Sequence, residues 1–151
     1  MVRLADAGDE AAVASLIASF RDYYDEAEPT DEQIATLVAE LIGDQYTEFL
    51  LAGEPPVGVA QIRFRPSLWT GSEDAWLEDL FVTPDARRSG AGRALVQACV
   101  DRARARGCKR IQLDANEHNG PALALYESLG FASTTPGRFD GGRNLYFTRW
   151  L

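Results

Sequence analysis

Apolar residues recur with helical spacing in four segments of the chain. From about Asp9 to Arg21 they stand at i, i+3, i+4 and i+7, which predicts an amphipathic helix. Thr30-Asp-Glu-Gln33 fits a capping box and predicts the start of a second helix, which Gly43 can end. Two more helices are expected at about 91–106, capped by Gly107, and at 119–130, with Phe131 making the hydrophobic contact that follows a glycine cap.

Short runs rich in β-branched and aromatic residues predict strands between these helices. They lie at 2–5, 46–52, 57–64, 76–82, 110–115 and 145–150. Gly53–Pro56 and Asp140-Gly-Gly142 provide hairpin turns. The element order is β-α-α-β-β-β-α-β-α-β-β, which predicts an α/β fold with a mixed central sheet of six to seven strands flanked by four helices.

A length of 151 residues predicts one domain, 1–151. No apolar stretch approaches the roughly 18 residues that cross a bilayer, and the first residues do not resemble a signal peptide. Cys99 and Cys108 are the only cysteines, and their spacing fits neither a metal site nor a redox pair. We therefore expect a cytoplasmic protein without a membrane partner.

The net charge of −8 is unevenly distributed along the chain. Residues 1–60 carry 13 Asp or Glu and 2 Arg, a balance of −11, whereas residues 61–151 carry 10 Asp or Glu and 13 Lys or Arg, a balance of +3. An acidic protein is a poor partner for nucleic acid, because neutralising phosphates dominates that affinity. The two parts could instead hold two ligands of opposite charge.

A glycine-rich segment with three arginines, Arg87-Arg-Ser-Gly90-Ala-Gly92-Arg93, lies between a predicted strand and a predicted helix. Free amides at a helix N-terminus favour an anion, and glycines let a phosphate approach closely. The dinucleotide fingerprint is incomplete, since Leu95 occupies its third glycine position, and the Gly-Lys-Ser/Thr of nucleotide-triphosphate loops is absent. Alone, the segment fits a phosphate cradle or a plain strand–helix connection.

A second motif, Asn119-Gly-Pro-Ala122-Leu-Ala-Leu-Tyr126-Glu-Ser-Leu-Gly130-Phe131, follows the glycine segment. Together the two motifs resemble those of the GNAT superfamily of acetyl-CoA-dependent N-acetyltransferases, whose element order the whole chain also matches. Glu78, nine residues before Arg87, makes the chain somewhat similar to diamine and polyamine acetyltransferases. The resemblance implies a GNAT-like sheet and acetyl-CoA as co-substrate, with no metal.

The resemblance also implies residues that hold the cofactor. The loop amides would bind the pyrophosphate, the backbone near Phe81 and Val82 would pair with the pantetheine arm, and Asn119 would touch the same arm. Arg87 or Arg93 would meet the adenosine 3′-phosphate. The expected cofactor-binding residues are Leu80, Phe81, Val82, Arg87, Arg88, Ser89, Gly90, Ala91, Gly92, Arg93 and Asn119.

Acetyl transfer to an amine requires a base and an acid. An alkyl amine with a pKa near 10.4 must lose a proton, and Glu78 is the expected base; otherwise it is a surface carboxylate. A backbone amide near Leu80 or Phe81 could stabilise the oxyanion if the strand bulges there. Tyr126 is the expected acid for the departing thiolate, or else a core tyrosine.

The acceptor is expected to bind at Tyr23, Tyr24, Asp25, Glu78 and Asp79. Carboxylates beside aromatic rings suit an ammonium ion, although the segment from Asp22 to Glu32 also fits a solvated linker. His118, the only histidine, is expected in a loop, and no residue cluster suggests a metal. Edge strands make a homodimer plausible.

These observations predict an N-acetyltransferase that moves an acetyl group from acetyl-CoA to a primary amine, a small cationic one, by direct attack in a ternary complex. A protein N-terminal or lysine acetyltransferase, a non-catalytic acyl-CoA-binding module and a nucleotide-binding regulatory domain are the alternatives.

Overall fold

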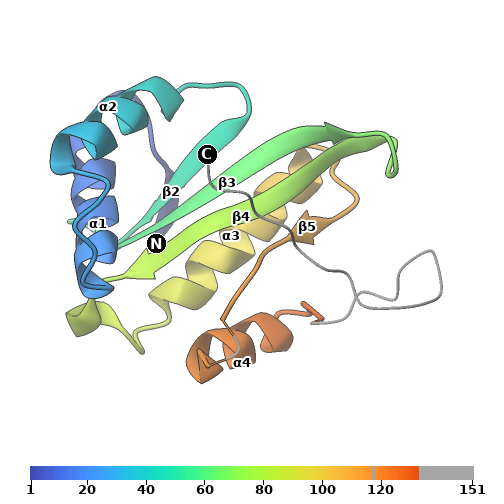
Figure 1. Ribbon diagram of the computed structural model, residues 1–151. Coiled ribbons are helices and arrows are strands. Elements are labelled where there is room, and N and C mark those ends of the chain that lie inside the picture. The colour runs from blue at the N-terminus through green and yellow to red at the C-terminus, as the bar shows by residue number, and fades with distance from the viewer. Residues whose placement is uncertain (117, 133–151) are drawn as a thin grey trace. The chain divides into compact units, whose positions relative to one another are not determined.

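One open mixed sheet with the strand order β1-β2-β3-β4-β5 forms the centre of residues 1–114 (Figure 1). The structure is a computed structural model that describes residues 1–116 and 118–132. The chain forms two compact units, Met1–Asp114 and Ala115–Leu151. The elements in chain order are β1 (Val2–Leu4), α1 (Glu10–Tyr23), α2 (Asp31–Leu41), β2 (Thr47–Ala52), β3 (Gly58–Ser67), β4 (Ser72–Val82), a 3₁₀ turn (Pro84–Ala86), α3 (Ala91–Ala105), β5 (Ile111–Gln112) and α4 (Gly120–Ser128).

Neighbouring strands from β1 to β4 pair antiparallel, and β4 pairs parallel with β5. The parallel ladder is short: it joins only Ala75 with Ile111 and Trp76 with Gln112. The strand predicted at 110–115 is therefore correct in place but too long. Beyond Trp76, β4 continues for six residues, Leu77–Val82, without a strand paired on that side among the described residues.

The predicted element order is confirmed through the fourth helix, but the sheet is smaller than predicted. The described residues form five strands, not six to seven. The predicted closing strand at 145–150 and its turn at Asp140–Gly142 lie outside the described residues.

The hairpin of β3 and β4 is longer than the sequence predicts. Pairing continues past Phe64 to Ser67 opposite Ser72, although Pro66 lies in the strand. Ion pairs stabilise this extension: Asp74, buried in β4, pairs with Arg110 at 2.7 Å, and Glu73 pairs with Arg106 at 2.9 Å.

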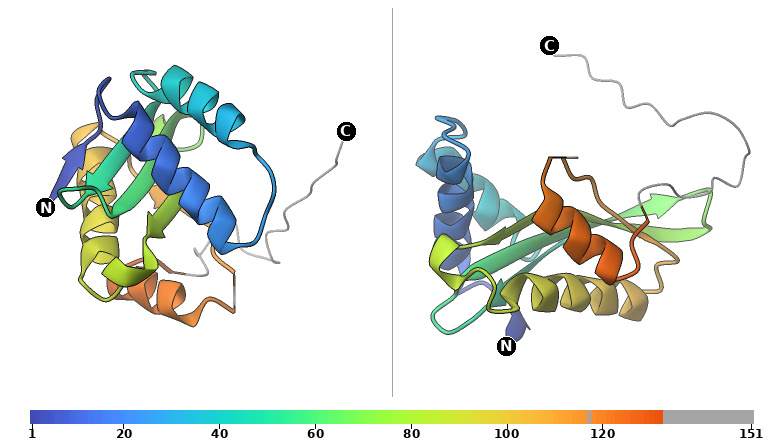
Figure 2. Two further views of the ribbon diagram at one scale, coloured as in Figure 1. Left: turned by 90° about the vertical axis from the view of Figure 1, so that its left-hand side faces the viewer. Right: turned by 90° about the horizontal axis from the view of Figure 1, so that it is seen from below.

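Helices cover both faces of the sheet of residues 1–114 (Figure 2). On one face, α1 and α2 pack on β2, β3 and β4 through a buried cluster comprising Val13, Leu16, Ile34, Val38, Phe49, Leu51, Val59 and Phe81. On the other face, α3 buries Leu95, Val96 and Cys99 fully. Here α3 approaches β3 so closely that a Cβ on Gly58 would lie 3.1 Å from Leu95 Cδ1. This close approach fixes the start of α3 beside the end of β4.

Local signals in the sequence set several helix ends. Thr30 accepts a hydrogen bond from the Gln33 amide at 3.2 Å and its own amide donates to Gln33 Oε1 at 2.8 Å, so the predicted capping box is confirmed. Glycines with positive φ follow α2 and α3 at Gly43 and Gly107.

Candidate acetyl-CoA and amine site

A β-bulge interrupts β4 at Glu78. Leu77 pairs with Ile62, whereas the next paired residue, Asp79, lies opposite Gln61, so Glu78 is an additional residue on β4. The bulge lies two residues before the predicted position near Leu80. Such bulges redirect backbone and side chains and are frequent next to active sites.

Two neighbouring carboxylates at the bulge have different environments. Glu78 is exposed, and Asp79 is only partly exposed. The pKa of Asp79 is raised to about 6, chiefly by burial and also by the negative charges of Glu78 and Asp114. None of these three carboxylates forms an ion pair within the described part of the chain. The sequence did not predict that Gln61 and Asp114 belong to this site. Gln61 is placed there by its pairing with Asp79, and Asp114 by its electrostatic effect on the same carboxylate.

The backbone of β4 offers hydrogen-bonding groups on the edge away from β3. The Thr83 amide donates to the Val57 carbonyl at 2.9 Å, so these two residues form a hydrogen-bonded pair. Because such pairs alternate along antiparallel strands, Phe81 directs its backbone groups to Val59, and Leu80 and Val82 direct theirs to the opposite edge. The predicted pair of residues was Phe81 and Val82; the geometry favours Leu80 and Val82.

The glycine segment forms the entry to α3. After the 3₁₀ turn, Arg88 (φ +64°) and Gly90 (φ +89°) both take left-handed conformations. Ser89 Oγ donates to the Ala86 carbonyl at 2.7 Å, and the first helical bond runs from the Ala94 amide to the Gly90 carbonyl at 3.0 Å. A Cβ on Gly90 would meet no atom within 4 Å. The Ala91 amide donates to Ser89 Oγ at 3.4 Å. The open space at Gly90, beside the first turn of α3, fits a diphosphate.

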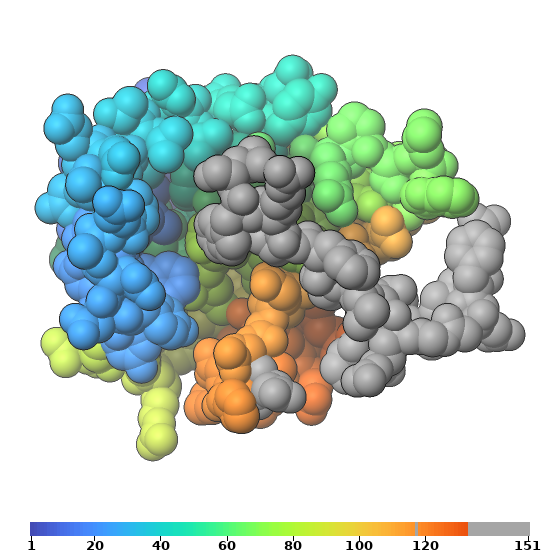
Figure 3. Space-filling model, in the orientation of Figure 1, coloured from blue at the N-terminus to red at the C-terminus, as the bar shows by residue number. Residues whose placement is uncertain are grey.

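Arg87 makes its contacts within the protein. Its Nε donates to the Val82 carbonyl at 3.1 Å and its Nη1 to Tyr23 Oη at 2.9 Å. The guanidinium carbon lies 4.2 Å from the centre of the Tyr23 ring and 6.0 Å from that of Phe81. In Figure 3 the yellow-green residues around 85 adjoin the blue end of α1.

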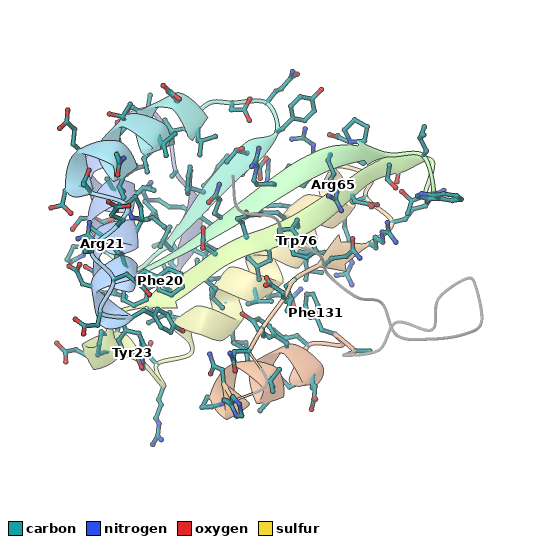
Figure 4. The ribbon with its side chains drawn as sticks, in the orientation of Figure 1. Phe20, Arg21, Tyr23, Arg65, Trp76 and Phe131 are labelled. Carbon is teal, nitrogen blue, oxygen red and sulfur yellow. The ribbon has the colours of Figure 1, made fainter. Side chains whose placement is uncertain are left out.

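Aromatic rings gather where α1 ends beside β4 (Figure 4). The rings of Phe20 and Phe81 are stacked with centres 5.3 Å apart, and Tyr23 and Tyr24 meet edge to face at 5.3 Å. Tyr23 and Tyr24 are about half exposed. The predicted acceptor residue Asp25 follows with φ +56°.

The acidic connection between α1 and α2 is partly neutralised by Arg21. Its guanidinium pairs with Asp22 and with Asp31, both at 2.7 Å, and donates to the Pro29 carbonyl at 2.7 Å. Asp22 and Asp31 therefore serve to hold this connection together, which supports the linker interpretation for these two residues.

In the unit that begins at Ala115, Asn119 and Tyr126 occupy the two ends of α4. Asn119 is the N-cap, and its Oδ1 accepts from the Ala122 amide at 3.3 Å. At the other end the Phe131 amide donates to the Tyr126 carbonyl and the Gly130 amide to that of Glu127, a Schellman motif. The rings of Tyr126 and Phe131 lie 5.9 Å apart, so the predicted contact at this cap is confirmed. His118 lies exposed before the helix, in the predicted loop.

Three further properties of the described residues bear on other possible functions: a cavity, metal binding and membrane insertion. A cavity of about 280 Å³ lies elsewhere, between Leu4, Ile42, Thr47, Phe49 and Arg106, and contains none of the predicted site residues. No group of His, Cys, Asp or Glu in residues 1–116 and 118–132 is arranged to hold a metal ion. Over the same residues, no helix has the length and apolar character needed to cross a membrane.

Comparison with known proteins identifies the family. Residues 13–131 match the Acetyltransferase (GNAT) family. The chain is 33% identical over 137 residues to an uncharacterized N-acetyltransferase of Bacillus subtilis (strain 168), YhfO, covering 89% of this chain and 91% of the relative. It is 28% identical over 158 residues to thialysine N-epsilon-acetyltransferase of Bos taurus, with coverages of 93% and 92%.

Solved structures agree with this assignment. The crystal structure of a proposed acetyltransferase from Arthrobacter sp. FB24 is 31% identical and superposes with a TM-score of 0.88, covering 100% of this chain and 96% of that one. The chain is therefore a member of the GNAT family: an N-acetyltransferase, of the enzyme class that uses acetyl-CoA as co-substrate.

Proposed function

We propose that the enzyme transfers the acetyl group of acetyl-CoA to a small cationic primary amine, by direct attack in a ternary complex. The observation that carries this proposal is the group of three carboxylates, Glu78, Asp79 and Asp114, whose mutual repulsion contributes to the raised pKa of Asp79. A bound ammonium group would relieve that repulsion. The name of the bovine relative, which specifies the ε-amine of thialysine, agrees with such an acceptor.

The cofactor would lie along β4 and over the start of α3. The edge at Leu80 and Val82, where the described residues place no paired strand, would pair with the amide groups of pantetheine in the manner of an added strand, with the Val82 carbonyl also accepting from Arg87. The amides of residues 88–93 would hold the diphosphate, with Ser89 stabilising the loop and the exposed Arg88 and Arg93 adding positive charge. Asn119 would contact the pantetheine arm. Bound in this way, the cofactor supplies an activated thioester carbonyl.

Glu78 and Asp79 would prepare the amine. Both would bind the ammonium group, and one would accept its proton before the nitrogen forms the new bond to the acetyl carbon. Glu78 remains a candidate for this base. Asp79 joins it, because a pKa of about 6 leaves its carboxylate mostly ionised at neutral pH while keeping it a better base than an ordinary carboxylate.

Tyr126 would complete the transfer. When the bond between the acetyl carbon and sulfur breaks, the thiolate would take a proton from the tyrosine hydroxyl, which is protonated at neutral pH, and the second proton released by the nitrogen would restore that hydroxyl. The Schellman motif and the Phe131 ring hold the end of α4 that carries Tyr126. A backbone amide at the bulge would stabilise the oxyanion.

The test is thiol release from acetyl-CoA across a panel of amines. The panel contains diamines, thialysine, lysine, neutral amino acids and peptides with free N-termini. Efficient turnover of small cationic amines that is strongly reduced, but still measurable, in both Glu78→Gln and Asp79→Asn supports the proposal. A preference for peptides assigns the enzyme to protein acetylation, and a preference for neutral or acidic amino acids contradicts the role given to the carboxylates.

A further inference from the structure

Arg87 connects three parts of the proposed site. It begins the glycine segment, its Nε binds the Val82 carbonyl on the free edge of β4, and its Nη1 binds Tyr23 at the end of α1. Tyr23 and Arg87 are 64 positions apart in the sequence. No other pair of hydrogen-bonded side chains in the described residues spans a longer sequence separation.

The contacts of Arg87 hold its guanidinium in a defined plane. Bonds at Nε and Nη1 fix the group from two sides, and the Tyr23 ring lies against its face at 4.2 Å. A bidentate phosphate contact through Nε would require the bond to Val82 to break. Among the described residues, no hydrogen bond restrains the Arg88 side chain in this way, and this side chain is exposed.

Tyr23 connects Arg87 with the end of α1, where the amine is proposed to bind. Its ring lies 6.4 Å from that of Phe81 and 5.3 Å from that of Tyr24, and the acidic connection begins directly after it. Tyr23 is the last residue of α1 and stands two positions before Asp25.

We propose that Arg87 is a positioning residue that couples the two substrate sites, and not a ligand of the 3′-phosphate. This inference rests on the proposed function. A cofactor bound beside Val82 and the glycine segment further restricts Arg87. Through its bond to Tyr23, Arg87 then restricts the end of α1 and the connection from Tyr24 to Pro29 that follows it. Cofactor binding thus raises the affinity for the amine, and by linkage the amine raises the affinity for the cofactor.

A double-mutant cycle tests the coupling. Arg87→Gln, Tyr23→Phe and the double variant are compared at saturating acetyl-CoA, with Arg104→Gln, an exposed arginine on α3, as a matched control. We expect each single variant to raise the KM for the amine about tenfold with kcat within about threefold, and the double variant to do no more than either, because the pair acts as a unit.

Calorimetry with CoA and with dephospho-CoA separates positioning from phosphate binding. If Arg87 positions, Arg87→Gln retains the preference for CoA over dephospho-CoA and binds CoA within about threefold of wild type. If Arg87→Gln loses that preference, with CoA affinity reduced about tenfold or more, Arg87 is a phosphate ligand and the proposal is wrong. The proposal is also wrong if the effects of Arg87→Gln and Tyr23→Phe on the KM for the amine add up in the double variant.

Hydrogen exchange provides a readout that needs no acceptor. CoA should slow amide exchange in residues 23–30 of the wild type and of Arg104→Gln, but not of Arg87→Gln or Tyr23→Phe. Tyr23→Phe loses only a hydroxyl, so it keeps the test valid if Arg87→Gln fails to fold. If CoA slows amide exchange in residues 23–30 equally in all variants, the proposed coupling is wrong. Absence of turnover with every amine, combined with CoA-dependent protection, contradicts the proposed function alone.

Discussion

Asp79 lies directly opposite Gln61 in the β3–β4 pair, one residue after the bulge residue Glu78. Gln61 is 8% exposed, and the Asp79 carboxylate is itself partly buried and subject to the negative charges of Glu78 and Asp114. This position makes a carboxylate costly to keep charged, and the cost can be measured.

We expect the contribution of Asp79 to the stability of the protein to fall as pH rises from about 4 to about 6. Because the pKa of Asp79 is raised from 3.8 to about 6, the folded state binds a proton more tightly than the unfolded state in this range. Above about pH 6 the Asp79 carboxylate is ionised, and the full cost of burying its charge lowers the stability of the folded state. Asp79→Asn should therefore increase the free energy of unfolding at pH 8 by about 1–3 kcal/mol and have little effect near pH 4. Denaturant unfolding at both pH values measures this, with exposed Glu78→Gln as the control expected to show a smaller change.

The same residue should shape the pH dependence of catalysis. If Asp79 accepts the proton of the amine, kcat/KM should decline below about pH 6, where its carboxylate is protonated. In Asp79→Asn the remaining activity should lack this decline. A pH profile that keeps its acidic limb in Asp79→Asn and loses it in Glu78→Gln would assign the base to Glu78.

Gly90→Asp should weaken CoA binding at least tenfold, or about 1.4 kcal/mol, by placing a negative charge at the start of α3. Any side chain at Gly90 is strained, because φ is +89°. Gly90→Ala carries the strain without the charge, so the difference between the two variants in calorimetry isolates the electrostatic effect. Equal CoA affinities for the two variants would exclude a phosphate at this position.

Tyr126→Phe should lower turnover about 100-fold, toward the lower end of typical general-acid effects, since a thiolate is a fair leaving group. The ring contact with Phe131 and the backbone bonds of the helix cap need no hydroxyl, so the thermal midpoint should remain close to that of the wild type. Turnover is measured with acetyl-CoA binding checked separately. Full activity would return Tyr126 to a packing role.

The KM for a cationic amine should rise with ionic strength, because salt screens charges beyond about 10 Å at 0.1 M. Asp25→Asn should raise it further at low salt. This substitution suits the site, since asparagine tolerates the left-handed conformation at φ +56°. Asp22 is a poor choice because it binds Arg21. Asp101→Asn on α3 is the control, and a salt response equal in both variants would show that the acidic connection does not attract the amine.

Features set by neighbouring residues were predictable from the sequence. The capping box of Thr30 and Gln33 and the cap at Gly130 with Phe131 involve residues at most five positions apart. The glycine segment likewise occurs at the predicted junction of a strand and a helix.

Features that depend on pairing between distant segments were not predictable. The bulge at Glu78 is defined by its register with Gln61 and Ile62, and no local signal marks it. The predicted strands stop at Phe64 and start again at Trp76, yet pairing extends to Ser67 and Ser72, near the ion pair between Asp74 and Arg110. The contact between Arg87 and Tyr23 joins two residues that the sequence assigns to separate ligands.

The short ladder between β4 and β5 also affects how the protein should be handled. The six residues Leu77–Val82 extend over roughly 20 Å without a paired strand on that side among the described residues, and an edge proposed to pair with pantetheine could equally pair with a strand of another molecule. Protein prepared without CoA should therefore self-associate more readily on concentration or storage than protein saturated with CoA, and the cofactor would act as a protective cap on the sheet.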